Sequence, residues 1–254
     1  MFFSTIILFF IYTYNYLGDF VIVINGKKIL YILIFICILF CLFFIFLNDS
    51  TIPTSSTPVN NHTVVIDAGH GYPDEGASSL DGTTESNINL SISLKLQELL
   101  EASGCNVILT RSDKNGIYNA SSESIREKKV SDLKNRVDII NNSSADLLVS
   151  IHLNKFEDSK YSGWQSFYRK NDDNSKNLAV SIQNNLNLSI QKENKRQALS
   201  ISDKYIIDKT SVPATIIECG FLSNNEELNL LKTDEYQDRI AWGIYTGIMD
   251  YMSY

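Results

Sequence analysis

The chain has 254 residues, 44% of them hydrophobic and 20% charged, which suits one full domain with an extension and excludes wholesale disorder. Residues 1–50 hold two of the 29 acidic and two of the 22 basic side chains, so the rest carries the whole net charge of −7. An acidic domain without a Lys/Arg stripe argues against nucleic acid as a partner.

The first 47 residues are interpreted as a hydrophobic membrane anchor, with its main span at Ile29–Leu47. That run holds no charged residue, and at about 1.5 Å per residue it nearly matches the roughly 30 Å hydrocarbon core. Lys27 and Lys28 precede it, and the positive-inside rule then places everything after Leu47 outside the membrane. A cleaved signal peptide is the alternative, and the sequence leaves open whether residues 1–25 form a helix of their own.

A polar stretch rich in Ser, Thr and Pro, residues 48–61, is expected to be a linker, and residues 62–254 the catalytic domain. Short apolar runs predict strands at Thr63–Asp67, Asn106–Leu109, Asp146–His152, Trp164–Tyr168, Tyr205–Ile207 and Ala214–Cys219. Helical spacing predicts helices at Glu85–Ser103, Val130–Asn141, Asn174–Leu188, Asn225–Leu231 and Glu235–Tyr251. This alternation predicts a single α/β domain with a mostly parallel twisted sheet and helices on both faces.

Two histidines stand at the ends of separate predicted strands. His70 lies between two glycines directly after the first strand, in the sequence Asp67-Ala-Gly-His-Gly, where a packed core residue is not expected. His152 ends another apolar strand, and by a period of two Asn154 should share its face. A hydrogen-bonded core histidine remains the alternative for His152, and a cap for the following loop remains the alternative for Asn154.

Two glutamates complete the candidate site. Glu218 lies at the end of an apolar strand, where a carboxylate needs a metal, a cation or a proton. Glu85 opens a predicted helix, where favourable interaction with the helix dipole is an alternative explanation. A catalytic zinc commonly takes three ligands from His and Asp/Glu and leaves a position for water, so His70, His152 and one glutamate could hold one zinc while the other glutamate moves protons.

Four segments taken together resemble the zinc-dependent N-acetylmuramoyl-L-alanine amidases of the Amidase_3 type. They are VVIDAGHG, TTESNINLSISLKLQELLEASGCNVILTR, SDLKNRVDIINNSSADLLVSIHLN and PATIIECGFLSN, and the resemblance covers nearly all of residues 62–254. It implies that His70, Glu85 and His152 are the zinc ligands and that Glu218 is the catalytic glutamate. Asp67 and Asn154 are further candidates for contacts with the substrate or the ligands.

The resemblance also implies a reaction and a setting. The reaction is hydrolysis of the amide between N-acetylmuramic acid and L-alanine in peptidoglycan, a glycan strand that carries stem peptides. Within the family the chain is most similar to germination-specific amidases, which implies spore cortex as substrate, a position between the forespore membranes, and a polysaccharide deacetylase that completes muramic-δ-lactam. An acidic domain has little general attraction for anionic wall polymers, so an activating protein is expected as a further partner. A vegetative autolytic amidase, another zinc peptidase or deacetylase, and an inactive wall-binding module are the alternatives.

Overall fold

The computed structural model describes residues 26–47 and 62–253, which belong to two separate units. The first unit contains helix α2 (Gly26–Leu47). Within the described ranges, no helix reaches the length and apolar character that crossing a membrane requires. The anchor over residues 1–47 therefore stays a prediction from the sequence, and residues 1–25 and the expected linker 48–61 lie outside the described residues.

The second unit is an α/β domain built on a twisted sheet. Its described residues form six strands in the order β2-β1-β3-β6-β4-β5. The strands are β1 (Thr63–Ala68), β2 (Asn106–Leu109), β3 (Leu147–Asn154), β4 (Gln165–Arg169), β5 (Leu199–Ile201) and β6 (Ala214–Phe221). Strands β2, β1, β3 and β6 run parallel, whereas β4 pairs antiparallel with β6 and carries β5 parallel to itself. The prediction of a mostly parallel sheet is confirmed.

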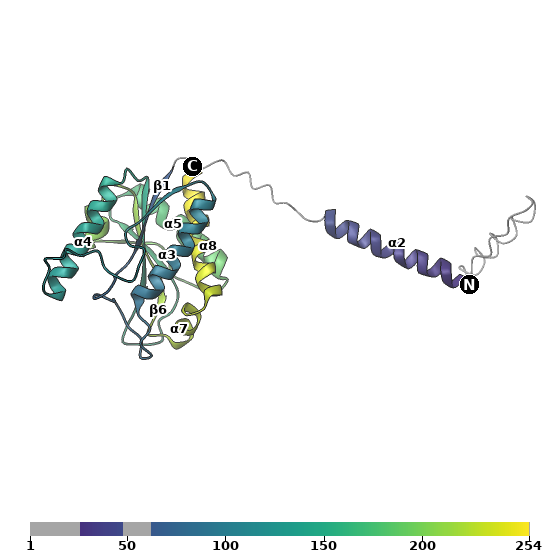
Figure 1. The fold of residues 1–254 in the computed structure, drawn as a ribbon, viewed down its shortest axis with the longest axis horizontal. Helices are drawn as coiled ribbons and strands as arrows, with labels where there is room; N and C mark the ends of the chain where they lie inside the picture. Colours follow the sequence, from purple (N-terminus) through teal and green to yellow (C-terminus); the bar gives the residue numbers. More distant parts are fainter. Residues whose placement is uncertain (1–25, 48–61, 254) are drawn as a thin grey trace, which may run out of the picture. The chain divides into compact units, whose positions relative to one another are not determined.

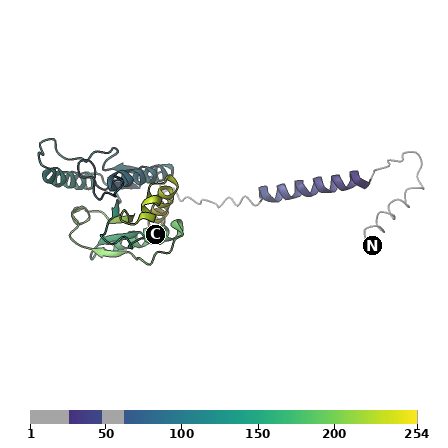
Figure 2. The same ribbon diagram turned by 90° about the horizontal axis from the view of Figure 1, so that it is seen from below.

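Helices cover both faces of this sheet (Figures 1 and 2). They are α3 (Glu85–Ala102), α4 (Ile125–Asn142), α5 (Asp173–Ile190), α6 (Tyr205–Lys209), α7 (Asn225–Leu231) and α8 (Asp234–Met252). Buried side chains of α3, α5, α7 and α8 form the larger core on one face, and those of α4 and α6 form a smaller core on the other. Because β1, β3 and β6 are parallel neighbours in the sheet, their carboxyl ends meet at the same edge of it.

The structure corrects the sequence prediction in three places. Residues Tyr205–Ile207 were expected to be a strand but form the start of α6, and the short strand β5 was not expected. Ile206 and Ile207 are buried beneath the sheet, and burial of a three-residue apolar run does not distinguish helix from strand. Helix α4 also begins before the expected Val130, because Ser124 and Glu127 form a reciprocal capping box.

The two cysteines of the domain are free thiols. Cys105 and Cys219 are both buried and form no disulfide with each other. Cys219 lies in the larger core, fully shielded from solvent, and burial raises the pKa of its thiol. It is therefore a packing residue, as its strand position predicts.

Helices α5 and α8 pack closely through two glycines of α8. A Cβ on Gly247 would lie 2.5 Å from the Cα of Ile182, and one on Gly243 would lie 3.0 Å from the Cα of Leu186. Both contacts are with backbone atoms of α5, which cannot move without separating the helices. Small residues at these positions therefore fix the spacing of the two helices.

We expect the change Gly247→Ala to destabilise the domain by about 1–2 kcal/mol. Helix propensity alone favours alanine by ~0.8–1 kcal/mol, but overpacking against α5 costs about 1–3 kcal/mol. Urea unfolding measures the difference, and Thr246→Ala on the same helix is the control, with a change within about 0.5 kcal/mol. A stabilised Gly247→Ala protein would contradict the close approach of α5 and α8.

Candidate active site

The loop that follows β1 presents His70 in an unusual backbone conformation. His70 has a φ of 63°, in the left-handed region that non-glycine residues rarely adopt. The preceding Gly69 donates its N–H to the carbonyl of Ile151, and a Cβ at Gly69 would overlap the ring of His152. The glycine therefore allows the two histidines to approach each other from neighbouring strands.

Two buried arginines hold the carbonyl groups of this loop. Arg136 of α4 donates to the carbonyls of Ala68 (2.8 Å) and His70 (2.6 Å). Arg111, which follows β2, donates to the carbonyls of Ala68 (2.8 Å) and Gly69 (3.1 Å). The peptide groups around His70 are thus satisfied by charged donors, whose hydrogen bonds are stronger than those between neutral groups.

Asp67 is the counter-ion of Arg136 and does not belong to the group of candidate metal ligands. Its carboxylate lies 2.6 Å from Arg136 Nη1 and accepts hydrogen bonds from Ser150 and Thr110. Burial alone would raise the pKa of Asp67, but the Arg136 charge and the Ser150 hydroxyl lower it to about 2. The sequence selected Asp67 for a contact with substrate or ligands, and the structure places it under the loop as a support for Arg136.

Glu85 is the first residue of α3, and its carboxylate points away from the helix toward the strand ends. One oxygen accepts the N–H of Ala77 (2.9 Å) and the other accepts the N–H of Leu153 (3.1 Å). Gly76 has a φ of 70° and leaves room for this carboxylate, because a Cβ there would lie 2.5 Å from Glu85 Oε2. Thr84 is the N-cap residue of α3, although its side chain makes no capping hydrogen bond.

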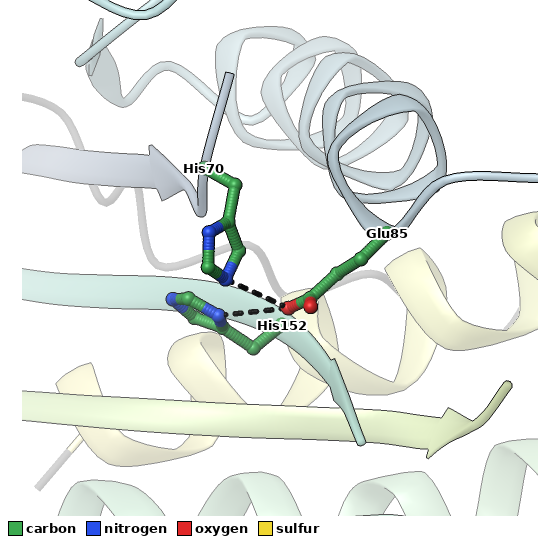
Figure 3. Close-up of side chains that lie close together, drawn as sticks. All are labelled: His70, Glu85 and His152. Carbon is green, nitrogen blue, oxygen red and sulfur yellow. Dashed lines mark hydrogen bonds and ion pairs between the residues drawn. The ribbon is translucent and has the colours of Figure 1, made fainter. Parts of the chain in front are cut away.

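His70, Glu85 and His152 converge at the edge of the sheet, as Figure 3 shows. Glu85 Oε1 lies 3.3 Å from His70 Nε2 and 3.0 Å from His152 Nδ1, and one ligand atom of each residue lies within 4.8 Å of the others. Ligands ~2.1 Å from a tetrahedral zinc ion lie roughly 3.4 Å apart, so the donor atoms and their spacing fit that ion. These three residues could therefore hold a metal.

The neighbouring charges stabilise the ionised carboxylate of Glu85 and the protonated ring of His70. Burial would raise the pKa of Glu85, but hydrogen bonds and charges of the two histidines hold it well below its usual range. Burial would lower the pKa of His70, but Asp74 and Glu85 together raise it to about 9. A carboxylate between two imidazole rings is thus kept charged, which is the state that binds a cation. His70 has to release its proton before its Nε2 can bind a metal, because only the neutral imidazole is a ligand.

Asp74 is a functional candidate that the sequence analysis did not identify. Its Oδ2 lies 3.3 Å from His70 Nδ1, on the side of the ring away from Glu85, and 3.0 Å from Lys129 Nζ. A carboxylate behind a metal-binding histidine fixes the orientation of the ring and increases the basicity of the ligand nitrogen. No sequence signal distinguishes Asp74 from other acidic residues of the loop.

Glu218 lies beside the three residues on β6. It is paired with His152 in the β3–β6 register, so the two side chains share a face of the sheet with strands about 4.8 Å apart. Its Oε2 is buried and has no hydrogen-bond partner among the described residues, and burial raises the pKa of the carboxyl group. A buried carboxyl group with a free oxygen next to the metal-binding group can accept and return a proton.

Asn154 contacts the loop that follows β3. Its side-chain oxygen accepts the N–H of Lys155 (2.9 Å), which is the capping role that the sequence left open. The β3–β6 register shifts between His152 and Asn154 because β6 has one extra residue before Phe221, whereas β3 continues as a regular strand to Asn154. His152 and Asn154 therefore lie on the same face of β3, as the period of two predicts. A contact between Asn154 and substrate stays a prediction.

The family comparison agrees with this geometry. Residues 64–250 match the model of the Amidase_3 family, which is described as N-acetylmuramoyl-L-alanine amidase. The matched range includes the two histidines and both glutamates of the site as well as every described strand except the first residue of β1.

Relatives and solved structures lead to the same family. The germination-specific N-acetylmuramoyl-L-alanine amidase of Bacillus subtilis is 34% identical over 227 residues, which cover 89% of this chain and 95% of that protein. The CwlD amidase of Clostridioides difficile, solved in complex with the GerS lipoprotein, is 48% identical with a TM-score of 0.74, over 76% of this chain and 99% of that one. An N-acetylmuramoyl-L-alanine amidase of Clostridium difficile 630 is 32% identical with a TM-score of 0.66, over 76% and 98%. The chain therefore belongs to the N-acetylmuramoyl-L-alanine amidases of the Amidase_3 family and is similar to CwlD.

Proposed function

We propose that this amidase depends on zinc and removes stem peptides from spore-cortex peptidoglycan. The observation that carries the zinc proposal is the convergence of His70, Glu85 and His152 on one point, with the unpartnered carboxyl group of Glu218 beside them. The similarity to a germination-specific amidase supports the cortex as the substrate.

The reaction is hydrolysis of the amide between the lactyl group of N-acetylmuramic acid and L-alanine. Zinc at this site supplies Lewis acidity toward the amide carbonyl and lowers the pKa of water toward ~7. Glu218 takes a proton from the attacking water and then donates it to the departing alanine nitrogen. Its buried environment raises its pKa, which keeps the proton available for this second step. Glu85 and the two histidines hold the metal, and Asp74 orients His70.

The cortex proposal implies a place and partners. The catalytic domain acts outside the membrane, in the cortex between the forespore membranes, and its product is the substrate of a polysaccharide deacetylase that completes muramic-δ-lactam. The complex of the CwlD relative with a lipoprotein supports an activating protein partner for this chain as well.

A tether at the membrane is proposed from the sequence alone. The uncharged run Ile29–Leu47 supports it, together with the exposed apolar side chains between Leu30 and Phe40 in α2. Tethering raises the local concentration of the enzyme near its substrate, which offsets weak affinity for the wall.

The purified enzyme is expected to release free stem peptides from cortex peptidoglycan faster than from vegetative walls. Chromatography of the digests distinguishes the alternatives, because released acetate would indicate a deacetylase and an unchanged profile would indicate a binding module. Equal rates on both walls would contradict the cortex proposal while leaving the amidase reaction intact.

The change Asp74→Asn is expected to weaken zinc binding by about 10–100-fold, because a neutral amide no longer supports the charge and orientation of His70. Competition with a chromophoric chelator measures the affinity, and the wild type should bind one zinc per chain. Glu75→Gln removes the same charge from the neighbouring exposed residue and should leave the affinity unchanged. Equal loss in both variants would indicate a general charge effect.

The change Glu218→Gln is expected to retain zinc and fold while lowering turnover by about 10²–10⁴-fold, since an amide of the same shape cannot accept the proton. Metal analysis and the rate of stem-peptide release are measured together. Glu85→Gln is the matched comparison and should lose zinc. The opposite result, with zinc lost from Glu218→Gln and kept by Glu85→Gln, would exchange the roles of the two glutamates.

A further inference from the structure

Three aromatic rings form a cluster at the same edge of the sheet as the candidate metal ligands. The aromatic cluster consists of Phe156, Tyr161 and Phe221, whose ring centroids lie 5.1–6.4 Å apart. Phe221 is only 1% exposed and forms the base, whereas Phe156 is 44% exposed and Tyr161 is 39% exposed. Rings this exposed gain little from folding, so their exposure is not explained by stability of the domain.

The surrounding loops hold the cluster in place. The Glu227 carboxylate accepts the N–H groups of Phe221 (2.9 Å) and Gly163 (2.7 Å), which joins the end of β6 to the loop before β4. The N–H of Phe156 donates to the Ser223 hydroxyl at 3.2 Å. The rings are therefore preorganised, which lowers the entropic cost of binding a ligand against them.

The cluster lies within reach of the proposed reaction. Phe221 follows Glu218 by three residues and Phe156 follows His152 by four, so at about 3.3 Å per extended residue their backbones lie at most roughly 10–13 Å from those site residues. Lys155, beside Phe156, donates from Nζ to the carbonyl of Ser78 (2.6 Å) in the loop that leads to Glu85. The loop that carries Phe156 therefore contacts the loop that leads to Glu85.

The exposed apolar area is small. An aromatic side chain presents about 200 Å², so the two partly exposed rings offer roughly 160 Å², against about 800 Å² per partner in a stable protein interface. This area suits a small rigid ligand with one apolar face. A pyranose ring is such a ligand, because its C–H groups gather on one face while its hydroxyl groups point outward to solvent.

We propose that Phe156 and Tyr161 form a subsite that stacks against a sugar ring of the glycan strand next to the cleaved amide. The inference rests on the proposed function, which requires the glycan to lie along this edge of the sheet. The subsite binds the glycan without touching the scissile bond, so it contributes to affinity for polymeric substrate and not to the chemical step.

The test uses the full-length chain in detergent and glycan strands that have been stripped of stem peptides. The double change Phe156→Ala/Tyr161→Ala should weaken glycan binding by about tenfold in calorimetry. It should raise KM on intact peptidoglycan while leaving turnover of a minimal N-acetylmuramoyl peptide unchanged. Phe156→Trp keeps an aromatic face and should stay within about twofold of the wild type.

Trp242→Ala is the matched control, because Trp242 is an exposed aromatic residue on α8 and should have no effect. Unchanged glycan binding in the double variant, or no binding by the wild type, would overturn the subsite. An equal loss of activity on the minimal and polymeric substrates would also overturn the subsite. It would show that the aromatic cluster supports the position of Glu218 and does not bind glycan. Glycan binding that depends on the cluster in an enzyme that releases no stem peptide would refute the proposed function alone.

Discussion

The buried ion pair between Arg136 and Asp67 is the interaction on which the active-site edge depends. The guanidinium group of Arg136 donates hydrogen bonds to the Asp67 carboxylate and to the carbonyls of Ala68 and His70, where the chain turns sharply out of β1. The left-handed conformation of His70 costs of order 1–3 kcal/mol, and surrounding contacts must enforce it. Losing one partner of such a buried pair costs about 3–5 kcal/mol, because the other charge is left buried and unpaired. Neither Arg136 nor Asp67 can therefore be removed alone without disturbing the loop that carries His70.

Much of the fold follows from local pattern, and the exceptions have physical reasons. The run Val64–Ile66 is apolar on consecutive positions, which indicates a strand covered on both faces, and all three side chains are fully buried. Strand β5 carries Leu199 and Ser200 exposed to solvent, so it has no hydrophobic pattern to reveal it. The antiparallel direction of β4 depends on which strand it meets in space, and periodicity within one segment carries no such information.

Some residues of the candidate site can likewise be recognised in the sequence, and others cannot. Polar residues at the ends of apolar strands, such as His152 and Glu218, stand out in the sequence because burying them without partners is costly. Arg136 lies beside the apolar Val137 on the buried side of α4, and this irregularity is a signal that a buried charge is present. Asp74 gives no such signal, since a carboxylate in a glycine-containing loop is ordinary. Alternation along β3 places Asn154 on the face of His152, but its hydrogen bond to the N–H of Lys155 depends on the loop that follows the strand, which periodicity does not predict.

The convergence of two histidines on Glu85 has a consequence for how the proposed zinc would be acquired. The three groups come from separate stretches of chain, and Glu85 is also fixed by the backbone of Ala77 and Leu153, so the unfolded chain contains no preformed site. Zinc that binds only the folded domain raises the free energy of unfolding, by about 2.7 kcal/mol when the free zinc concentration is a hundred times the dissociation constant. If the domain is exported before it binds zinc, the zinc concentration outside the membrane would determine how well the folded domain resists proteases. Low zinc would then lead to degradation of the enzyme as well as to loss of its activity.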